Sequence, residues 1–246
     1  MGPVTIARLT GAELVARALA AVDGAAAPLA VAFCNAHTAE IALKDATFAR
    51  ALERFLVVND GIGVELGARL LEGRGFPENL NGTDFLPRLF GALARPTRVY
   101  LLGAKPGVAA QAAANFAARF PHYAAAGARD GYFPKEAGGA VAAEVAAARP
   151  DIVLVALGNP GQELFIAEHF DALGARVVFG VGALFDFTAG RVRRAPHWVR
   201  ALRAEWLYRL AQEPRRLARR YLIDTAVFLV AVLRLKRAGQ SRSGAQ

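Results

Sequence analysis

The stretch that decides the fold is Asp151-Ile152-Val153-Leu154-Val155-Ala156-Leu157, followed at once by Gly158-Asn159-Pro160-Gly161-Gln162-Glu163. A continuous apolar run that ends in a glycine-rich polar turn is typical of a strand covered on both faces of a parallel sheet. The turn leads into Gln162–Leu173, which has the length and composition of a helix. This strand–turn–helix unit predicts an α/β fold.

The same unit recurs along the chain. Further apolar runs of strand length are Leu29–Cys34, Phe55–Asn59, Arg98–Leu102 and Arg176–Val181. The segments between them predict helices at Thr38–Phe55, Val64–Leu71, Asp84–Ala94, Pro106–Phe120 and Lys135–Arg149. Regular alternation of strands and helices favours a Rossmann-like, mostly parallel sheet with helices on both faces.

Charge divides the chain into unequal parts. Residues 1–190 carry 16 Lys and Arg against 18 Asp and Glu, whereas residues 191–237 carry 13 against 3. We therefore expect an α/β catalytic core (1–190), a basic helical C-terminal appendage (191–237) and a loose polar tail (238–246). The excess positive charge of the appendage indicates an anionic partner, which is a membrane, a nucleic acid or a phosphorylated substrate.

The appendage shows no strand signal. Its apolar residues recur at helical spacing, at Trp198, Leu202, Trp206, Leu210, Leu217 and Tyr221. The apolar run Tyr221–Leu233 is too short to span a bilayer and contains Asp224. Two interpretations stay open: an interfacial helix on anionic lipid, or a buried terminal helix with a solvated basic face. The Trp/Leu stripe suits lipid better than a nucleic acid backbone.

Composition excludes several other classes. Cys34 is the single cysteine, so the chain contains no disulfide framework, which fits a reducing compartment. The first ten residues lack the pattern of a signal peptide. The four histidines are dispersed, no Asp-x-Asp pair exists, and the only serines lie at Ser241 and Ser243. No metal site, other cofactor or serine-nucleophile system is therefore predicted.

The loops that follow the predicted strands are polar and rich in glycine. Loops at the carboxyl ends of parallel strands open onto the ligand crevice, and a helix N-terminus there can bind an anion. These loops are Asn35-Ala36-His37, Asn59-Asp60-Gly61-Ile62-Gly63, Gly103-Ala104-Lys105-Pro106-Gly107, Gly158–Glu163 and Gly180–Asp186. The sequence thus predicts a ligand site that several loops build together.

Three polar residues in these segments have alternative roles. Asp60 is suited to act as a general base whose pKa partial burial would raise, but taken alone its position before Gly61 favours a helix N-cap. Asp84 is either a cap or a ligand of a hydroxyl group, and Gln162 is suited to bind the edge of a sugar or base.

A soluble Rossmann-like oxidoreductase is the alternative enzyme class, and a basic membrane- or nucleic-acid-binding module is the non-enzymatic alternative. The dinucleotide fingerprint fails because Gly61-Ile62-Gly63 is followed by Gly67 rather than by a glycine at position 66. Gly180-Val181-Gly182 likewise meets Phe185 where a third glycine is needed. No phosphate-binding P-loop motif is present either.

Taken together, the motifs resemble the WecG/TagA/CpsF family of bacterial glycosyltransferases. The resemblance rests on motifs that occur in the family's order between residues 30 and 222. They are Asp60-Gly61-Ile62-Gly63-Val64, Gly82-Thr83-Asp84, Leu101–Gly107, Asp130-Gly131-Tyr132-Phe133, Gly158-x-Pro160-x-Gln162-Glu163, Gly180–Gly190, Arg194-Ala195-Pro196, Glu205–Leu210 and Glu213–Arg216. Each motif is weak alone, but a chance match of all of them is implausible.

The resemblance implies a metal-independent, inverting hexosyl- or N-acetylhexosaminyltransferase that uses a UDP-sugar donor. The implied acceptor is a saccharide linked to polyprenyl diphosphate, in the synthesis of exopolysaccharide, teichoic acid or common antigen. The family's C-terminal appendage helps to close the active site and contacts the membrane. The enzyme would be peripheral, at the cytoplasmic face of the bacterial plasma membrane, and the sequence leaves self-association open.

The resemblance also assigns site residues. Asp60 falls on the family's proposed catalytic base, Asn35 on an active-site asparagine, and Gln162 on a glutamine near the sugar. Arginines of the appendage, here Arg209, Arg216 and Arg219, would stabilise the leaving diphosphate. The remaining substrate-binding residues are expected to be Gly61, Asp84, Gly103, Lys105, Asp130, Gly131, Tyr132, Gly158, Asp186 and Arg191.

Two positions depart from the family pattern. Phe33 stands where members often have Thr, and Asn79 and Leu80 occupy a stretch where many have Arg. Both positions lie near the sugar site in the family. The transferred sugar is therefore open between an N-acetylated sugar, a plain hexose and a uronic acid.

Overall fold

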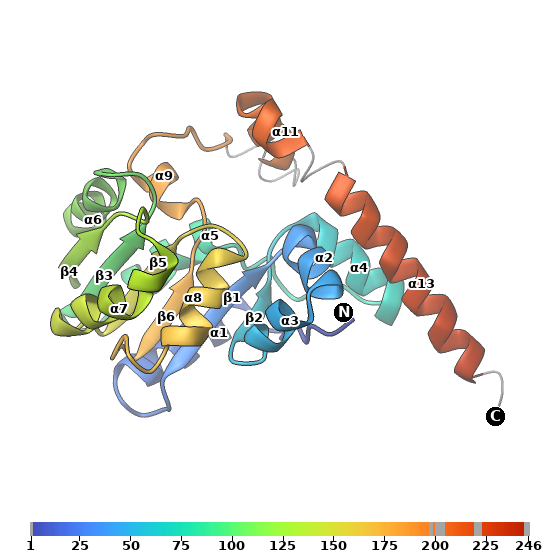
Figure 1. The fold of residues 1–246 in the computed structure, drawn as a ribbon, viewed down its shortest axis with the longest axis horizontal. Coiled ribbons are helices and arrows are strands. Elements are labelled where there is room, and N and C mark those ends of the chain that lie inside the picture. The colour runs from blue at the N-terminus through green and yellow to red at the C-terminus, as the bar shows by residue number, and fades with distance from the viewer. Residues whose placement is uncertain (1, 197–198, 200–204, 219–222, 244–246) are drawn as a thin grey trace.

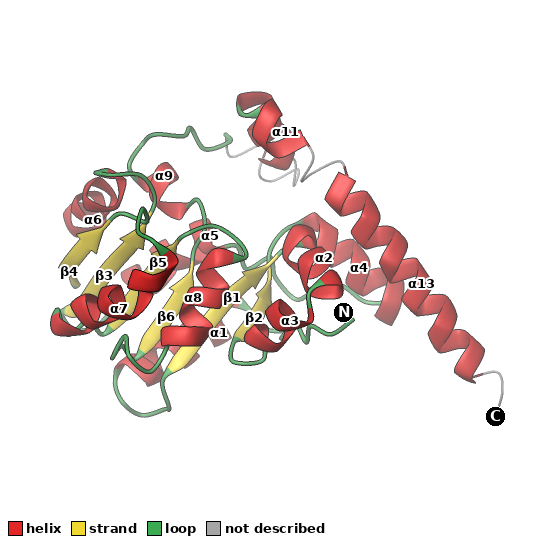
Figure 2. Cartoon of the chain, in the orientation of Figure 1, coloured by secondary structure: helices red, strands yellow, loops and turns green. Residues whose placement is uncertain are grey.

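The structure is a computed structural model that describes residues 2–196, 199, 205–218 and 223–243. Six strands form one parallel sheet in the order β2-β1-β6-β5-β3-β4. The strands are β1 (Leu29–Cys34), β2 (Leu56–Asn59), β3 (Thr97–Gly103), β4 (Tyr123–Arg129), β5 (Ile152–Ala156) and β6 (Val177–Gly180). All of them end at the same edge of the sheet (Figure 2). The predicted α/β class is confirmed.

Helices cover both faces of the sheet (Figure 1). Alternate strand residues feed two separate apolar clusters, as the period of two along a strand requires. One cluster packs against α1 (Gly11–Val22), α5 (Gly82–Gly91), α6 (Val108–Arg119) and α9 (Leu184–Thr188). The other packs against α2 (Ala36–Lys44), α3 (Ala46–Leu52), α4 (Ile62–Glu72), α7 (Gly138–Ala147), α8 (Gly161–His169) and α13 (Thr225–Ser243).

The order of the strands places a crevice in the middle of the sheet. The chain runs from β1 outward to β2, crosses to β3 and β4, and returns through β5 to β6 beside β1. Connections that leave neighbouring strands in opposite directions open a gap at the carboxyl edge, which is where open α/β sheets bind ligands.

The C-terminal segment is helical, as predicted. Its described elements are α11 (Glu205–Gln212), α12 (Pro214–Ala218) and α13, and α13 packs against α2 and α4. Phe228 and Val232 on its inner side are completely buried. Among the described residues, no helix is both long and apolar enough to cross a membrane.

The structure differs from the sequence prediction in four elements. The predicted helix Thr38–Phe55 is two helices, because Asp45 leaves the helical conformation and its carboxylate accepts hydrogen bonds from Thr47 N and Phe48 N. Helix α1, strand β4 and the short helix α9 were not predicted. The Gly180–Asp186 segment, predicted as a loop, therefore ends inside α9.

Candidate functional site

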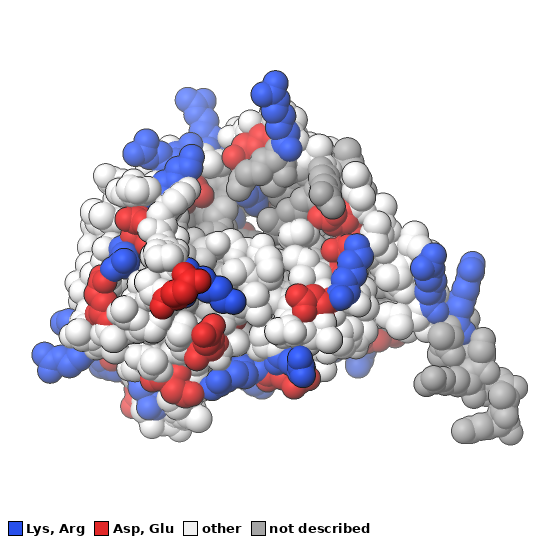
Figure 3. Space-filling view, in the orientation of Figure 1, with Lys and Arg blue, Asp and Glu red and all other residues white. Residues whose placement is uncertain are grey.

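A cavity of about 880 Å³ lies at the carboxyl edge of the sheet. Loops after all six strands line it, with residues that include Asn35, Asp60, Ala104, Gly131, Gly158 and Val181. The appendage closes it from above with Glu205, Trp206, Arg209 and Thr225. The space-filling view shows the molecule hollowed beneath α11 (Figure 3). A cavity of this size holds a ligand of nucleotide-sugar dimensions.

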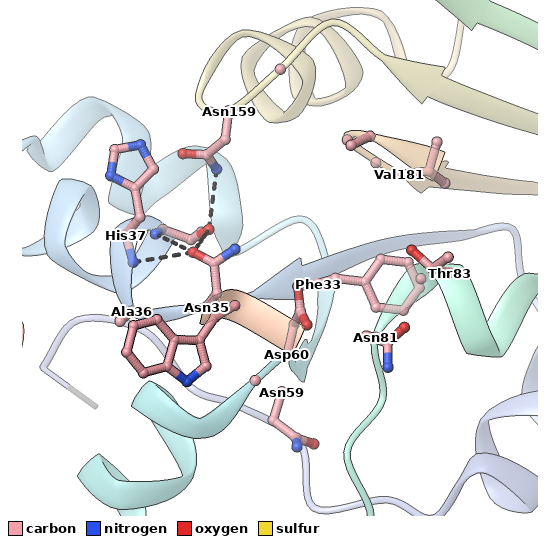
Figure 4. Close-up of a pocket in the computed structure, with 18 of the residues that line it drawn as sticks. Phe33, Asn35, Ala36, His37, Asn59, Asp60, Asn81, Thr83, Asn159 and Val181 are labelled. Carbon is pink, nitrogen blue, oxygen red and sulfur yellow. Dashed lines mark hydrogen bonds between the residues drawn. The ribbon is translucent and has the colours of Figure 1, made fainter. Parts of the chain in front are cut away.

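Asn35 is fixed by a capping role. It is the N-cap of α2, and its side-chain oxygen accepts hydrogen bonds from His37 N and Thr38 N, both at 3.1 Å. The Thr38 hydroxyl donates to the same oxygen at 3.3 Å. Because these donors hold the oxygen, the amide nitrogen is turned away from the helix, toward the space beside Asp60 and Phe33 (Figure 4). Asn35 can therefore offer an N–H donor to a ligand.

A short polar chain connects the loop after β1 with the loop after β5. Thr38 is buried, and its hydroxyl accepts a hydrogen bond from Asn159 Nδ2 at 3.3 Å (Figure 4). Since the single Thr38 proton is donated to Asn35, the hydroxyl can only accept from Asn159. The Asn159 side-chain oxygen is buried and makes no hydrogen bond with the described residues. The sequence analysis did not single out Thr38 or Asn159.

Asp60 follows the last residue of β2 and lines the cavity. Its backbone N–H donates to Cys34 O at 2.8 Å, which ties the ends of β1 and β2 together. The N-cap of α4 is Gly61, at a φ of 86°, and no side chain caps this helix. The interpretation of Asp60 as an N-cap is therefore wrong.

The loop between α4 and α5 forms one wall of the cavity. Glu65, which is buried, accepts hydrogen bonds from Phe76 N at 2.9 Å and from Arg69 Nε at 2.8 Å. Asn79, which lies with Leu80 in the stretch where many family members have Arg, accepts a hydrogen bond from Gly61 N at 2.7 Å. Asn79 thus supports the backbone beside Asp60 and adds no positive charge to the cavity.

Gln162 lines the cavity but binds mainly to the protein. It is 4% exposed, its oxygen accepts from Gly182 N at 3.0 Å, and its nitrogen donates to Glu163 Oε1 at 2.8 Å. Glu163 is completely buried at the start of α8. Gln162 therefore links the loop after β5 to the loop after β6, and one amide hydrogen is left for a ligand.

Cys34 lies beneath these groups. Burial raises the pKa of the Cys34 thiol, and the nearby Glu163 and Asp60 carboxylates raise it further. The thiol is therefore neutral and inert rather than a nucleophile.

The loops after β3 and β4 contribute a lysine side chain and an aromatic side chain to the cavity wall. Lys105 and Tyr132 are exposed, and both line the cavity together with Gly131. Asp130 does not line it; its carboxylate accepts from Tyr132 N at 2.9 Å and shapes the turn. Gly103 does not line it either. A Cβ at this position would overlap the backbone of Ala156, so only glycine fits here. Gly103 serves close packing of β3 on β5.

Asp186 and Gly158 line the cavity as predicted, but Arg191 does not. Arg191 is exposed, and its backbone N–H donates to Asp186 O at 2.9 Å. Phe33 lines the cavity while its ring stacks on Phe179, with centroids 6.3 Å apart. The cavity wall at position 33 is therefore aromatic, without the hydroxyl group of the family pattern.

Asp84 has a partner that the sequence analysis missed. The N-cap of α5 is Asn81, and Asp84 stands in the first turn. One carboxylate oxygen of Asp84 accepts from Asn81 Nδ2 at 2.8 Å, and the other lies 2.6 Å from Arg194 Nη2. Arg194 also lies 3.5 Å from Glu205 Oε1. Only the three-dimensional fold brings these groups together, so no sequence pattern could have identified the set.

Arg209 is the predicted diphosphate-binding arginine whose side chain is described. It lines the cavity, and its guanidinium carbon lies 5.0 Å from the centroid of the Phe187 ring. Its Nε is buried and makes no hydrogen bond with the described residues. Arg216 belongs to α12, but its side chain lies outside the described part of the structure. Arg219 lies outside the described residues altogether.

A second contact between ionisable side chains joins the appendage to the cavity, and it is an ion pair when His37 is protonated. His37 Nδ1 lies 2.8 Å from Asp224 Oδ2, just before α13 begins, and His37 lines the cavity. Across the described ranges, no group of three or more His, Cys, Asp and Glu side chains is arranged to hold a metal ion.

A parallel sheet whose strands all end at one shared cavity defines the class: a Rossmann-like α/β protein that binds its ligand at the carboxyl edge. A model of the glycosyl transferase WecG/TagA/CpsF family matches residues 1–242. The chain belongs to this family, as the motifs predicted.

Two relatives are similar over most of the chain, and both are named N-acetylglucosaminyldiphosphoundecaprenol N-acetyl-beta-D-mannosaminyltransferase. The protein of Bacillus subtilis (strain 168) is 36% identical over 182 residues, which is 73% of this chain and 70% of the relative. The protein of Bacillus spizizenii is 34% identical over 183 residues, or 74% and 69%.

Proposed function

We propose that the protein is an inverting glycosyltransferase that moves a sugar from a UDP-sugar to a saccharide linked to polyprenyl diphosphate. The observation that carries the proposal is the Asp60 carboxylate, which lines a cavity of nucleotide-sugar size and caps no helix. Family membership and the lipid-linked acceptor in the names of both relatives support it. The product would belong to a cell-surface polysaccharide.

In this mechanism Asp60 takes the proton from a hydroxyl group of the acceptor. The hydroxyl oxygen then bonds to the anomeric carbon of the donor sugar as the bond from that carbon to the UDP oxygen breaks. A single displacement of this kind inverts the anomeric configuration. The β-linked product in the names of both relatives agrees with that outcome if their donors are α-linked.

Fixed positive charge would stabilise the departing diphosphate. Lys105 reaches the cavity from the core and Arg209 reaches it from the appendage. Cations held in place beside a leaving group lower the barrier because they need no reorganisation as charge develops. We propose that they do this work without a metal ion, while the Asn35 amide nitrogen binds a substrate oxygen.

The protein would work on the cytoplasmic face of the bacterial plasma membrane. On α13, Val227, Val230 and Leu233 are 38%, 48% and 43% exposed, although Phe228 and Val232 are buried. Arg234, Lys236 and Arg237 follow on the exposed surface of α13, and Figure 3 shows basic side chains gathered along this helix. An apolar outer face next to basic residues suits an interfacial helix on anionic lipid.

The test is a transfer assay with N-acetylglucosaminyl-diphospholipid as acceptor. The donors are UDP-sugars that carry an N-acetyl group, a plain hexose or a uronic acid, and mass spectrometry detects the product. Asp60→Asn should lower kcat by a factor of about 10² to 10⁴, the usual contribution of a general base. Asp171→Asn, at an exposed carboxylate paired with Arg54, is the control and should match the wild type.

Two outcomes would contradict the proposal. Transfer from none of the donors by the wild-type protein would refute the reaction. Wild-type turnover by Asp60→Asn would refute the assignment of the base. The preferred donor also shows how the cavity tolerates Phe33 and Asn79 in place of the family's residues.

A further inference from the structure

Besides the packing of α13 on α2 and α4, the appendage contacts the core through charged side chains at two sides of the cavity. Among the described residues, the pairs that join residues 191–237 to residues 1–190 are Arg194 with Asp84 and Asp224 with His37. Each pair ends on a core residue that lines the cavity. The two attachments therefore lie where the appendage meets the site.

The first attachment is a bridge rather than a single pair. Arg194 Nη2 lies 2.6 Å from Asp84 Oδ1, and Arg194 Nε lies 3.5 Å from Glu205 Oε1. Glu205 is the first residue of α11. The Arg194 side chain is 26% exposed, so water screens these interactions only in part. One guanidinium thus links the start of α5 to the start of α11.

The second attachment lies at the beginning of α13. His37 Nδ1 and Asp224 Oδ2 are 2.8 Å apart, with 24% and 14% of their side chains exposed. His37 stands in the first turn of α2, two residues after the capping residue Asn35. This pair therefore connects the appendage to the turn that orients the Asn35 amide.

Between the two attachments lies α11, with Trp206 and Arg209 facing the cavity. Arg209 rests on Phe187, and its Nε makes no hydrogen bond with the described residues. Its direction therefore depends on where α11 is held.

We propose that the Arg194 and Asp224 ion pairs form a clamp that holds α11 over the cavity, and that Arg194 and Asp224 are positioning residues for Arg209. The consequence for catalysis rests on the proposed function, whereas the clamp itself does not. Arginine is suited to position 194 because its delocalised charge lies near two carboxylates at once, although Nε and Nη2 make no hydrogen bond with the described residues. Lysine, a point charge, could meet only one of them well.

Hydrogen–deuterium exchange of the full-length protein, without substrate, tests the clamp. The variants are Arg194→Gln, Arg194→Lys and Asp224→Asn, and the control is Arg193→Gln at the exposed neighbour. Exchange in residues 205–212 should be about 3 to 10 times faster in Arg194→Gln and Asp224→Asn, as expected when a charged contact is lost. Arg194→Lys should fall between Arg194→Gln and the wild type.

Exchange in β1 and β5 should stay unchanged, which shows that the core remains folded. The clamp would be overturned if residues 205–212 exchanged at the same rate in Arg194→Gln, Asp224→Asn and the wild type. It would also be overturned if Arg193→Gln raised the exchange rate as much as Arg194→Gln does. Donor KM should also rise about 3- to 10-fold in Arg194→Gln and Asp224→Asn, with partial recovery in Arg194→Lys. An inactive wild-type protein would refute the proposed function and leave the exchange result standing.

Discussion

At the scale of single residues, the polar side chains around the cavity bind one another as much as they face the ligand. The oxygen of Asn35 caps α2, and both the oxygen and the nitrogen of the Gln162 side-chain amide have protein partners. Such residues are pre-oriented, so a ligand meets groups whose direction is already set. Their removal should therefore disturb the loops as well as the contact with substrate.

Gln162→Met tests this view of Gln162. The nearly isosteric side chain can neither accept from Gly182 N nor donate to the buried Glu163 carboxylate, and an unpaired buried polar group costs about 1–3 kcal/mol. We expect a melting temperature several degrees lower and a loss of transfer activity of at least about tenfold. Gln111→Met on the exposed face of α6 is the control. Full activity with a lowered melting temperature would limit Gln162 to a structural role.

The Cys34 thiol should be chemically silent in the folded protein. Its pKa is raised chiefly by burial and further by Glu163 and Asp60, so the thiolate is absent at mildly alkaline pH. A thiol-exchange reagent should label it only after urea unfolding, and the reagent should not inhibit transfer. Because the folded thiol has the higher pKa, the unfolded chain loses its proton first, and stability should fall as the pH rises above the ordinary thiol value. Fast labelling of native protein would contradict this.

At the scale of elements, the sequence predicts the central strands of the sheet better than its edge strands. The runs at β1, β5 and β6 are continuously apolar because both faces are covered. Strand β4 lies at the edge, most of its residues are partly exposed, and Tyr123-Ala-Ala-Ala-Gly-Ala-Arg129 lacks the apolar run of a central strand. The end of α2 was detectable at Asp45, whose carboxylate starts α3.

The C-terminal apolar run was compatible with a buried helix and with an interfacial helix, and α13 has one buried side and one exposed apolar side. Phe228 and Val232 are buried against the core, while Val227 and Val230 on other sides of the same helix are exposed. Apolar residues all around a helix predict burial but cannot say which side has a partner. Deletion of the appendage would uncover the core, so point substitutions on the outer side are the better test.

Val230→Asp should weaken binding to vesicles that contain anionic lipid and leave the fold intact. Val230 is 48% exposed, so the introduced aspartate would face water in the unbound protein and would have to enter the lipid when the helix binds a membrane. Vesicle co-sedimentation measures the effect, and Ala110→Asp on the exposed side of α6 is the control. Equal binding by both variants and the wild type would remove α13 from the proposed membrane contact.

At the scale of the whole molecule, the cavity collects residues from position 33 to position 225 of the chain. The loops after strands could be predicted to converge because parallel strands share one edge. The roles of Arg194, Thr38 and Asp224 could not, because each depends on a partner that only the folded chain brings near.

The proposed metal-independent transfer predicts full activity in the presence of EDTA. The cations assigned to the diphosphate, Lys105 and Arg209, are covalently part of the protein and no chelator removes them. The assay compares initial rates with EDTA, with added Mg²⁺ and without either. A rate that collapses in EDTA and returns with Mg²⁺ would assign charge stabilisation to a metal ion instead.

The roof of the cavity comes from a part of the chain that a ribosome makes after the core. Glu205, Trp206, Arg209 and Thr225 close a site whose floor is built from residues before position 190. During synthesis the sheet and its loops can therefore form while the cavity still lacks its cover. Sugar transfer should begin only after Asp224 has left the ribosome, so a half-made enzyme would not consume its donor.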